Sequence, residues 1–138
     1  MITNLSEMQA RELLRSARVG RLGCIVDDEP YIVPINYLFE NNYVYSHSLP
    51  GLKIDSLRQN PRACLQVDEV ESELCWRSVL AFGNFEEITD PAGRKEVLGG
   101  LLKRFPLLTP VESAIDGSPP TTIVFGIKID RLTGVSEG

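Results

Sequence analysis

The segment from Tyr43 to Lys53 reads Y-V-Y-S-H-S-L-P-G-L-K and marks a change from strand to helix. Residues 43–48 are rich in aromatic and β-branched side chains, which is typical of a strand. The Pro50-Gly51 pair predicts a tight turn. A short helix over 51–59 follows and ends before Pro61. The segment therefore predicts a strand–turn–helix unit, around which the rest of the chain can be ordered.

This unit gathers polar side chains at the start of the predicted helix: Ser46, His47, Ser48 and Lys53. A helix N-terminus has unpaired backbone N–H groups and a partial positive charge. Hydroxyls and a lysine at that place suit a phosphate group. An ordinary strand-to-helix connection with a solvated lysine would contain the same residues. On the residues alone, both interpretations stand.

The composition is that of a globular protein of one domain, spanning 1–138, with 43% hydrophobic and 24% charged residues. The net charge of -5 argues against a general nucleic-acid binder, but a small anionic ligand needs only a local positive cluster. No apolar run reaches the roughly 20 residues of a membrane span, and the first residues lack a signal-peptide pattern. We therefore expect a cytoplasmic protein with no membrane partner.

The cysteines Cys24, Cys64 and Cys75 have no C-x-x-C spacing, and the chain has a single histidine. An odd number of scattered cysteines indicates reduced thiols, most of them buried. The same scarcity of ligands argues against zinc.

Alternating and periodic patterns predict six strands, over 19–27, 31–40, 43–48, 62–70, 75–88 and 121–132. An amphipathic helix within 1–18 begins with a capping box at Ser6 and Gln9 and is expected to cover an open end of the barrel. A peripheral helix is expected over 90–105, followed by a loop over 106–120 with a possible helical piece near 111–115. Short turns between the strands, expected at 28–30 and at Asn41-Asn42, favour antiparallel hairpins. The predicted fold is mainly β: a six-stranded antiparallel split β-barrel with peripheral α-helices.

Two strand positions call for a special backbone. Pro34 removes a ladder donor, so it belongs in an edge strand or at a bulge. Gly83 predicts a bulge or a sharp bend. On the strand that contains Gly83, Trp76 and Ser78 are expected on one face, and Arg77 and Val79 on the other.

Five motifs occur in a fixed order along most of the chain. They are V-G-R-L-G at 19–23, P-Y-I-V-P-I-N-Y at 30–37, Y-S-H-S-L-P-G-L-K at 45–53, N-P-R-A-C-L-Q-V-D at 60–68, and W-R-S-V-L-A-F-G at 76–83. Together they resemble the pyridoxamine 5′-phosphate oxidase-like FMN-binding split barrels, in particular the branch of the nitroimidazole-resistance flavoproteins. The resemblance covers about Leu13 to Ile129.

That resemblance implies a homodimer with FMN in clefts between the subunits. The flavin ring would lie along the second strand, at Pro34, Ile35, Asn36 and Tyr37. The phosphate would be held by the segment that contains His47, Ser48 and Lys53.

Further positions match the same cleft, from the same or the partner subunit: Trp76, Arg77, Ser78 and Val79 of the fifth strand, with Gln66 as an additional candidate. Each position has a structural alternative: His47 as a satisfied structural histidine, Trp76 as a core residue, Arg77 as a solvated charge. An arginine in an apolar strand nevertheless favours an anionic partner, and Arg21 is a weaker candidate of the same kind.

The function expected is that of an FMN-dependent oxidoreductase that passes electrons from a nicotinamide donor to a small oxidant, with the redox chemistry supplied by the cofactor. No catalytic residue is assigned, because the sequence contains no Ser-His-Asp or Cys-His pattern. The sequence ends at Gly138 without the family's C-terminal arginine-and-histidine segment, which argues against pyridoxamine phosphate oxidation. The alternatives are a non-catalytic flavin-storing or regulatory protein, or the same barrel with a deazaflavin or a haem.

Overall fold

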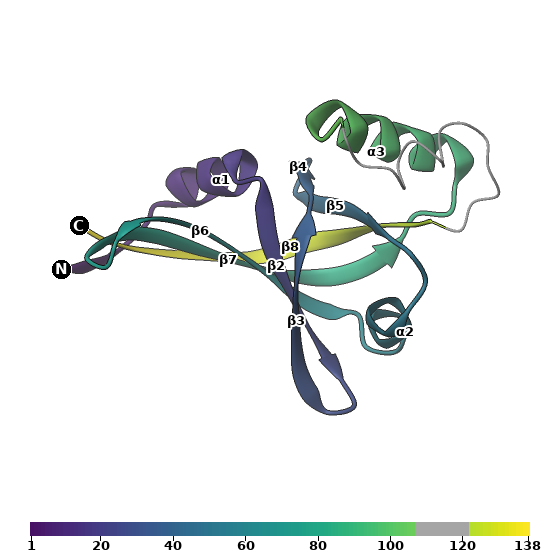
Figure 1. Cartoon of the computed structure of the whole chain (residues 1–138), viewed down its shortest axis with the longest axis horizontal. Helices are drawn as coiled ribbons and strands as arrows, with labels where there is room; N and C mark the ends of the chain where they lie inside the picture. The colour runs from purple at the N-terminus through teal and green to yellow at the C-terminus, as the bar shows by residue number, and fades with distance from the viewer. Residues whose placement is uncertain (107–121) are drawn as a thin grey trace.

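The computed structural model describes residues 1–106 and 122–138 (Figure 1). The elements are β1 (Ile2–Asn4), α1 (Glu7–Ser16), β2 (Val19–Val26), β3 (Glu29–Asn36), β4 (Leu38–Glu40), β5 (Tyr43–Ser48), α2 (Leu52–Gln59), β6 (Arg62–Ser72), β7 (Cys75–Glu87), α3 (Pro91–Arg104) and β8 (Ile123–Glu137). In the view of Figure 1, α1 and α3 lie above the sheet and α2 lies below it.

The strands form one antiparallel sheet in the order β3-β2-β6-β7-β8-β5-β4, and β1 pairs with the far end of β8. The two outer strands of that order, β3 and β4, follow one another directly in the chain. The chain thus joins the two ends of the sheet, and the mainly β, split-barrel prediction is confirmed.

The sheet has eight strands, where the sequence predicted six. One extra strand is β1. The other arises because the predicted strand over 31–40 is divided at Tyr37. Residues up to Asn36 pair with β2, which begins at Val19 opposite Asn36, and residues from Leu38 pair with β5. Since β2 offers no partner beyond Val19, the chain changes partners there.

The first hairpin turn lies at Asp27-Asp28, where φ is 50° and 63°, so the turn predicted at 28–30 is wrong by one residue. Both residues of such a two-residue turn need positive φ, which aspartate tolerates better than most residues. The Asn41-Asn42 turn has φ of 52° and 67° and lies where it was predicted.

Gly83 lies at a change of register between β7 and β8, so the predicted bulge is confirmed. A Cβ at this position would lie 2.1 Å from the carbonyl oxygen of Lys128, so only glycine fits. Pro34 lies in the outer strand β3, whose pairing with β2 shows no change of register. The edge interpretation therefore holds for Pro34.

The main core fills the barrel, and α1 covers one end of it with Ala10, Leu13 and Leu14. The predicted capping box of α1 is present, with both Ser6 and Gln9 hydrogen bonds. A smaller cluster packs α3 against β8 and β5. The helical piece predicted at 111–115 lies outside the described residues. Within the described ranges, no helix is both long enough and apolar enough to cross a membrane.

Candidate functional site

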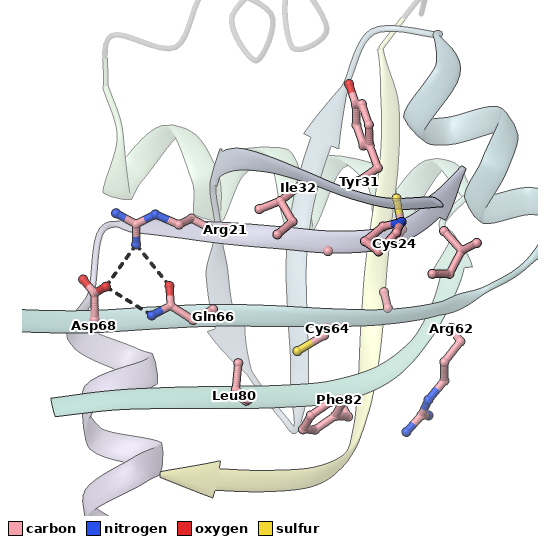
Figure 2. Close-up of a pocket in the computed structure, with 14 residues that line it drawn as sticks. Arg21, Cys24, Tyr31, Ile32, Arg62, Cys64, Gln66, Asp68, Leu80 and Phe82 are labelled. Atoms are coloured by element: carbon pink, nitrogen blue, oxygen red, sulfur yellow. Dashed lines mark hydrogen bonds and ion pairs between the residues drawn. The ribbon is translucent and has the colours of Figure 1, made fainter. Parts of the chain in front are cut away.

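A pocket of about 660 Å³ opens on the outward face of β2, β3, β6 and β7 (Figure 2). Strand register places one row of residues across its middle: Ile32, Gly23, Cys64 and Phe82. Gly23 has no side chain, so the surface is depressed at this position, between the side chains of Ile32 and Cys64. The result is an apolar trough whose volume lies in the range of small-molecule sites.

One end of the pocket is polar. The guanidinium of Arg21 donates to Gln66 Oε1 at 3.1 Å and lies 3.3 Å from Asp68 Oδ2 (Figure 2). The amide of Gln66 donates to Asp68 at 3.1 Å and to the Ser78 hydroxyl at 3.1 Å. Two of the predicted site residues, Gln66 and Ser78, are thus brought together, and Arg21 joins them. This network offers donors and acceptors to the polar edge of a ligand in the trough.

A second group of predicted site residues lies at the start of α2, which packs against β2. Cys24 lines the pocket and is buried, and α2 packs against its strand, β2. The amine of Lys53 on α2 interacts electrostatically with the Cys24 thiol. Burial lowers the pKa of Lys53, and the nearby Cys24 partly offsets that shift. Burial likewise raises the pKa of Cys24, and Lys53 opposes it. A half-buried cation therefore lies at the start of α2, on a helix that packs against β2, one of the strands that form the pocket. An anion near Lys53 would offset its desolvation.

His47 lies beside this lysine. Burial lowers the pKa of His47, and the charge of Lys53 lowers it further, so the ring is neutral at pH 7. Its Nδ1 atom is buried and has no hydrogen-bond partner within residues 1–106 and 122–138. A buried polar atom of this kind is costly unless something completes its hydrogen bonding.

The N-terminus of α2 is open. Its N-cap, Gly51, makes no side-chain cap. Apart from its chain neighbours and the helix backbone, no atom of residues 1–106 and 122–138 lies within 4 Å of the place where a Cβ would stand. The first amides of the helix therefore remain available to an anion. The Ser48 hydroxyl donates to the Leu49 carbonyl at 2.9 Å, so it would have to rotate to meet a ligand. Lys53, His47 and the open helix start fit a phosphate group.

The four residues predicted to lie along the flavin ring do not all point to the same face of the sheet. Ile35 and Tyr37 point into the core, and the Tyr37 hydroxyl donates to the Leu14 carbonyl. Pro34 is exposed, and Asn36 donates from Nδ2 to the Arg18 carbonyl at 3.2 Å. Only the backbone of Ile35 and Tyr37 could face a cofactor on the outward side, and the same holds for Val79, which is fully buried.

Trp76 and Arg77 are not brought to the main pocket within one chain. They line a separate hollow of about 160 Å³ at the end of the β6–β7 hairpin. The Trp76 indole donates to Glu137 at 3.2 Å, and Arg77 pairs with Glu69 at 2.9 Å. Any contact with a ligand of the main pocket would have to reach it from a second copy of the chain.

Sequence reasoning missed most of the trough. It did not select Gly23, Ile32, Cys64, Leu80 or Phe82. A signal was present: Ile25, Ile32 and Leu80 are large apolar residues on the face opposite the core, and they remain 40%, 68% and 36% exposed. Strands with apolar side chains on both faces indicate that the outer face of the sheet is also buried, by a ligand or by another protein.

The architecture defines a split-barrel protein with an apolar pocket on the outward face of its sheet. The family described as pyridoxamine 5′-phosphate oxidase matches residues 6–136, and the chain belongs to this family. The resemblance expected from the five motifs is thereby confirmed.

Three known proteins are similar over nearly the whole chain. An uncharacterised protein of Rhizobium meliloti (strain 1021) is 34% identical over 139 residues, which cover 94% of this chain and 91% of the relative. The crystal structure of a FAD-binding protein from Mesorhizobium loti has a TM-score of 0.84 and 32% identity, covering 100% of this chain and 99% of the other. A candidate 5-nitroimidazole antibiotic resistance protein from Bacteroides thetaiotaomicron has a TM-score of 0.79 and 22% identity, covering 99% and 87%, and shares the fold.

Proposed function

We propose that this protein binds a flavin nucleotide, FMN, in the outward pocket. The observation that carries the proposal is that an apolar trough on the outer face of β2 occurs together with a half-buried cation on α2, the helix that packs against the same strand. A flavin has the same two parts, a planar ring system and a phosphate. The fold and family agree with this assignment, and the Mesorhizobium loti protein of the same fold is described as FAD-binding.

The phosphate group would be held by Lys53, the first amides of α2 and the Nδ1 atom of His47. Lys53 supplies the charge, and the amides supply directed donors. FMN forms half of FAD, so the same contacts would serve either cofactor. Mass identification of the released chromophore distinguishes FMN from FAD.

A second copy of the chain would cover the pocket. The exposed residues Ile25, Ile32 and Leu80 form an apolar surface beside the trough, and such a surface is stabilised by burial. A homodimer would also bring Trp76 and Arg77 of the partner toward the trough, which one chain cannot do. Analytical ultracentrifugation of the flavin-loaded protein tests this, and a monomer at micromolar concentration would contradict it.

The proposed activity is that of an oxidoreductase, with a nicotinamide nucleotide as electron donor and a small oxidant as acceptor. The bound flavin supplies the two-electron chemistry. The residues of the chain hold and orient it: the trough excludes water, and Arg21, Gln66 and Ser78 offer hydrogen bonds to the polar edge of the ring. No side chain is required to form a covalent intermediate.

The decisive experiment is the absorption spectrum of the purified protein, followed by titration with FMN. A yellow protein with bands near those of free flavin supports the proposal. A colourless protein that FMN cannot saturate would overturn it. Turnover with reduced nicotinamide and quinones or nitro compounds then separates an enzyme from a flavin-storing protein, because the latter would show no rate above that of free FMN.

A further inference from the structure

Arginines gather at the junction of α1 and α3. Arg11 and Arg15 are four residues apart on one face of α1, and Arg18 follows directly after the extended C-cap residue Ala17. Arg104 ends α3 and reaches the same corner. A concentration of positive charge is unexpected in a chain with a net charge of -5.

Aromatic rings hold these guanidinium groups in place. Arg11 and Arg15 lie 5.7 Å and 5.8 Å from the centre of the Phe39 ring, and Arg18 lies 4.7 Å from that of Phe105. Arginine stacked on a ring keeps the N–H groups at its edge available for a phosphate. Such preorganisation lowers the entropy lost on binding.

The two helices also cap one another. Arg104 donates to the carbonyls of Arg15 and Ala17 at the end of α1, and Arg18 donates to the Arg104 carbonyl at 2.8 Å. These hydrogen bonds satisfy backbone carbonyls, but they bring no carboxylate to the arginines, so the positive charges remain. In the parts of the chain that the structure describes, neither Arg15 nor Arg18 has a carboxylate within 4.0 Å, whereas Arg11 lies 3.7 Å from Glu7. Arg15 and Arg18 are both exposed.

This corner is connected to the outward pocket. The Arg18 carbonyl accepts a hydrogen bond from Asn36 at the end of β3. Along β2, Arg21 lines the pocket three residues after Arg18, a span of about 10 Å for an extended chain. A dinucleotide that places one end in the trough could reach these arginines with the other.

We propose that Arg15 and Arg18 bind the 2′-phosphate of a phosphorylated nicotinamide dinucleotide, so that the electron donor of this protein is NADPH rather than NADH. The inference rests on the proposed function, because it assigns the donor of the same flavin site. The donor transfers a hydride to the flavin and leaves as NADP⁺, and a proton from solvent completes the two-electron reduction. Two arginine forks suit the charge and geometry of a phosphate monoester, which NADH lacks.

The test compares Arg15→Gln/Arg18→Gln with the control Lys95→Gln/Lys128→Gln, which removes two exposed positive charges elsewhere and reaches the same net charge. Binding of 2′,5′-ADP to the flavin-loaded protein is measured by calorimetry, and KM and kcat are measured with NADPH and NADH. We expect the arginine variant to weaken 2′,5′-ADP binding and raise KM for NADPH about tenfold, with kcat and the NADH values kept. The lysine control should behave as the wild type.

A second variant, Arg15→Gln alone, keeps the hydrogen bond from Arg18 to the Arg104 carbonyl, so it controls for a folding defect. It should show part of the loss in 2′,5′-ADP affinity and part of the rise in KM for NADPH. The inference is overturned if the wild type binds no 2′,5′-ADP, if NADH and NADPH give equal kcat/KM, or if the lysine control loses as much. These outcomes are separate from failure of the proposed function, which is a protein that takes up no flavin.

Discussion

The two ends of the predicted site differ in how their side chains meet. At the start of α2, His47 and Lys53 come from two elements joined by a turn and interact electrostatically, and Lys53 also interacts with Cys24 of β2. On β7, Trp76 and Arg77 are neighbours on one strand, and they are tied to Glu137 and Glu69 in a separate hollow. Neighbours on one strand point to opposite faces, whereas a turn can bring distant side chains together. The first end is complete within one chain, and the second would need a partner.

The largest effect is expected at Gly83, where the register between β7 and β8 changes. Gly83→Ala would place a Cβ 2.1 Å from the Lys128 carbonyl oxygen, so β7 and β8 would have to separate. We expect a loss of about 3 kcal/mol or more in the free energy of unfolding, measured by urea denaturation. Gly99→Ala is the control, because among the described residues no neighbouring atom lies within 4 Å of its Cβ position, and alanine favours the helix. Equal free energies of unfolding for the two variants would mean that the close approach of Gly83 to Lys128 is not needed for the pairing of β7 with β8.

The second-largest effect is expected at the start of α2, where His47 and Lys53 come together. Lys53→Ala should weaken FMN binding about ten- to a hundredfold, because the phosphate loses the positive charge of Lys53. Riboflavin has no phosphate, so its affinity should change little. Fluorescence quenching titrations with both flavins provide the measurement, and Lys95→Ala is the surface control. Equal losses for FMN and riboflavin would remove Lys53 from the phosphate site.

A smaller effect should follow from closing the helix start. In Gly51→Ser the hydroxyl can accept hydrogen bonds from the first amides of α2, the same donors that a phosphate would use. We expect unchanged or slightly increased thermal stability, and FMN affinity lowered about threefold to tenfold. Calorimetry of FMN binding and a thermal melt without flavin provide the two readouts. Unchanged affinity would place the phosphate away from the helix start.

The smallest effect on stability is expected at the hairpin end. Arg77 and Glu69 form an ion pair whose side chains are 37% and 52% exposed. Arg77→Gln should therefore change the free energy of unfolding by no more than about 0.5 kcal/mol. If the partner subunit supplies Arg77 to the trough, the same variant lowers FMN affinity in the dimer. A variant with wild-type FMN affinity in the dimer would leave Arg77 as a surface charge.

Several features of the fold could be predicted because they depend on residues close together in the chain. The capping box at Ser6, the Asn41-Asn42 turn and the bulge at Gly83 each follow from a local requirement for a hydrogen-bonding side chain or a special backbone. The strand boundaries agree closely for β2, β5 and β6 for the same reason, since alternation of side chains is visible over a few residues. The division of one predicted strand into β3 and β4 at Tyr37 could not be read in this way, because it depends on where β2 begins.

The sequence by itself determined the strands, the helix caps and, through five ordered motifs, the family. Only the tertiary structure decided which residues share the site. It placed Cys24 against Lys53 and joined Arg21 to Gln66 and Ser78. It also turned Ile35, Tyr37 and Val79 into the core and set Trp76 and Arg77 apart from the pocket. The physical reason is register: it decides which residues lie side by side on paired strands, and it is set by the packing of the whole sheet rather than by neighbours in the chain.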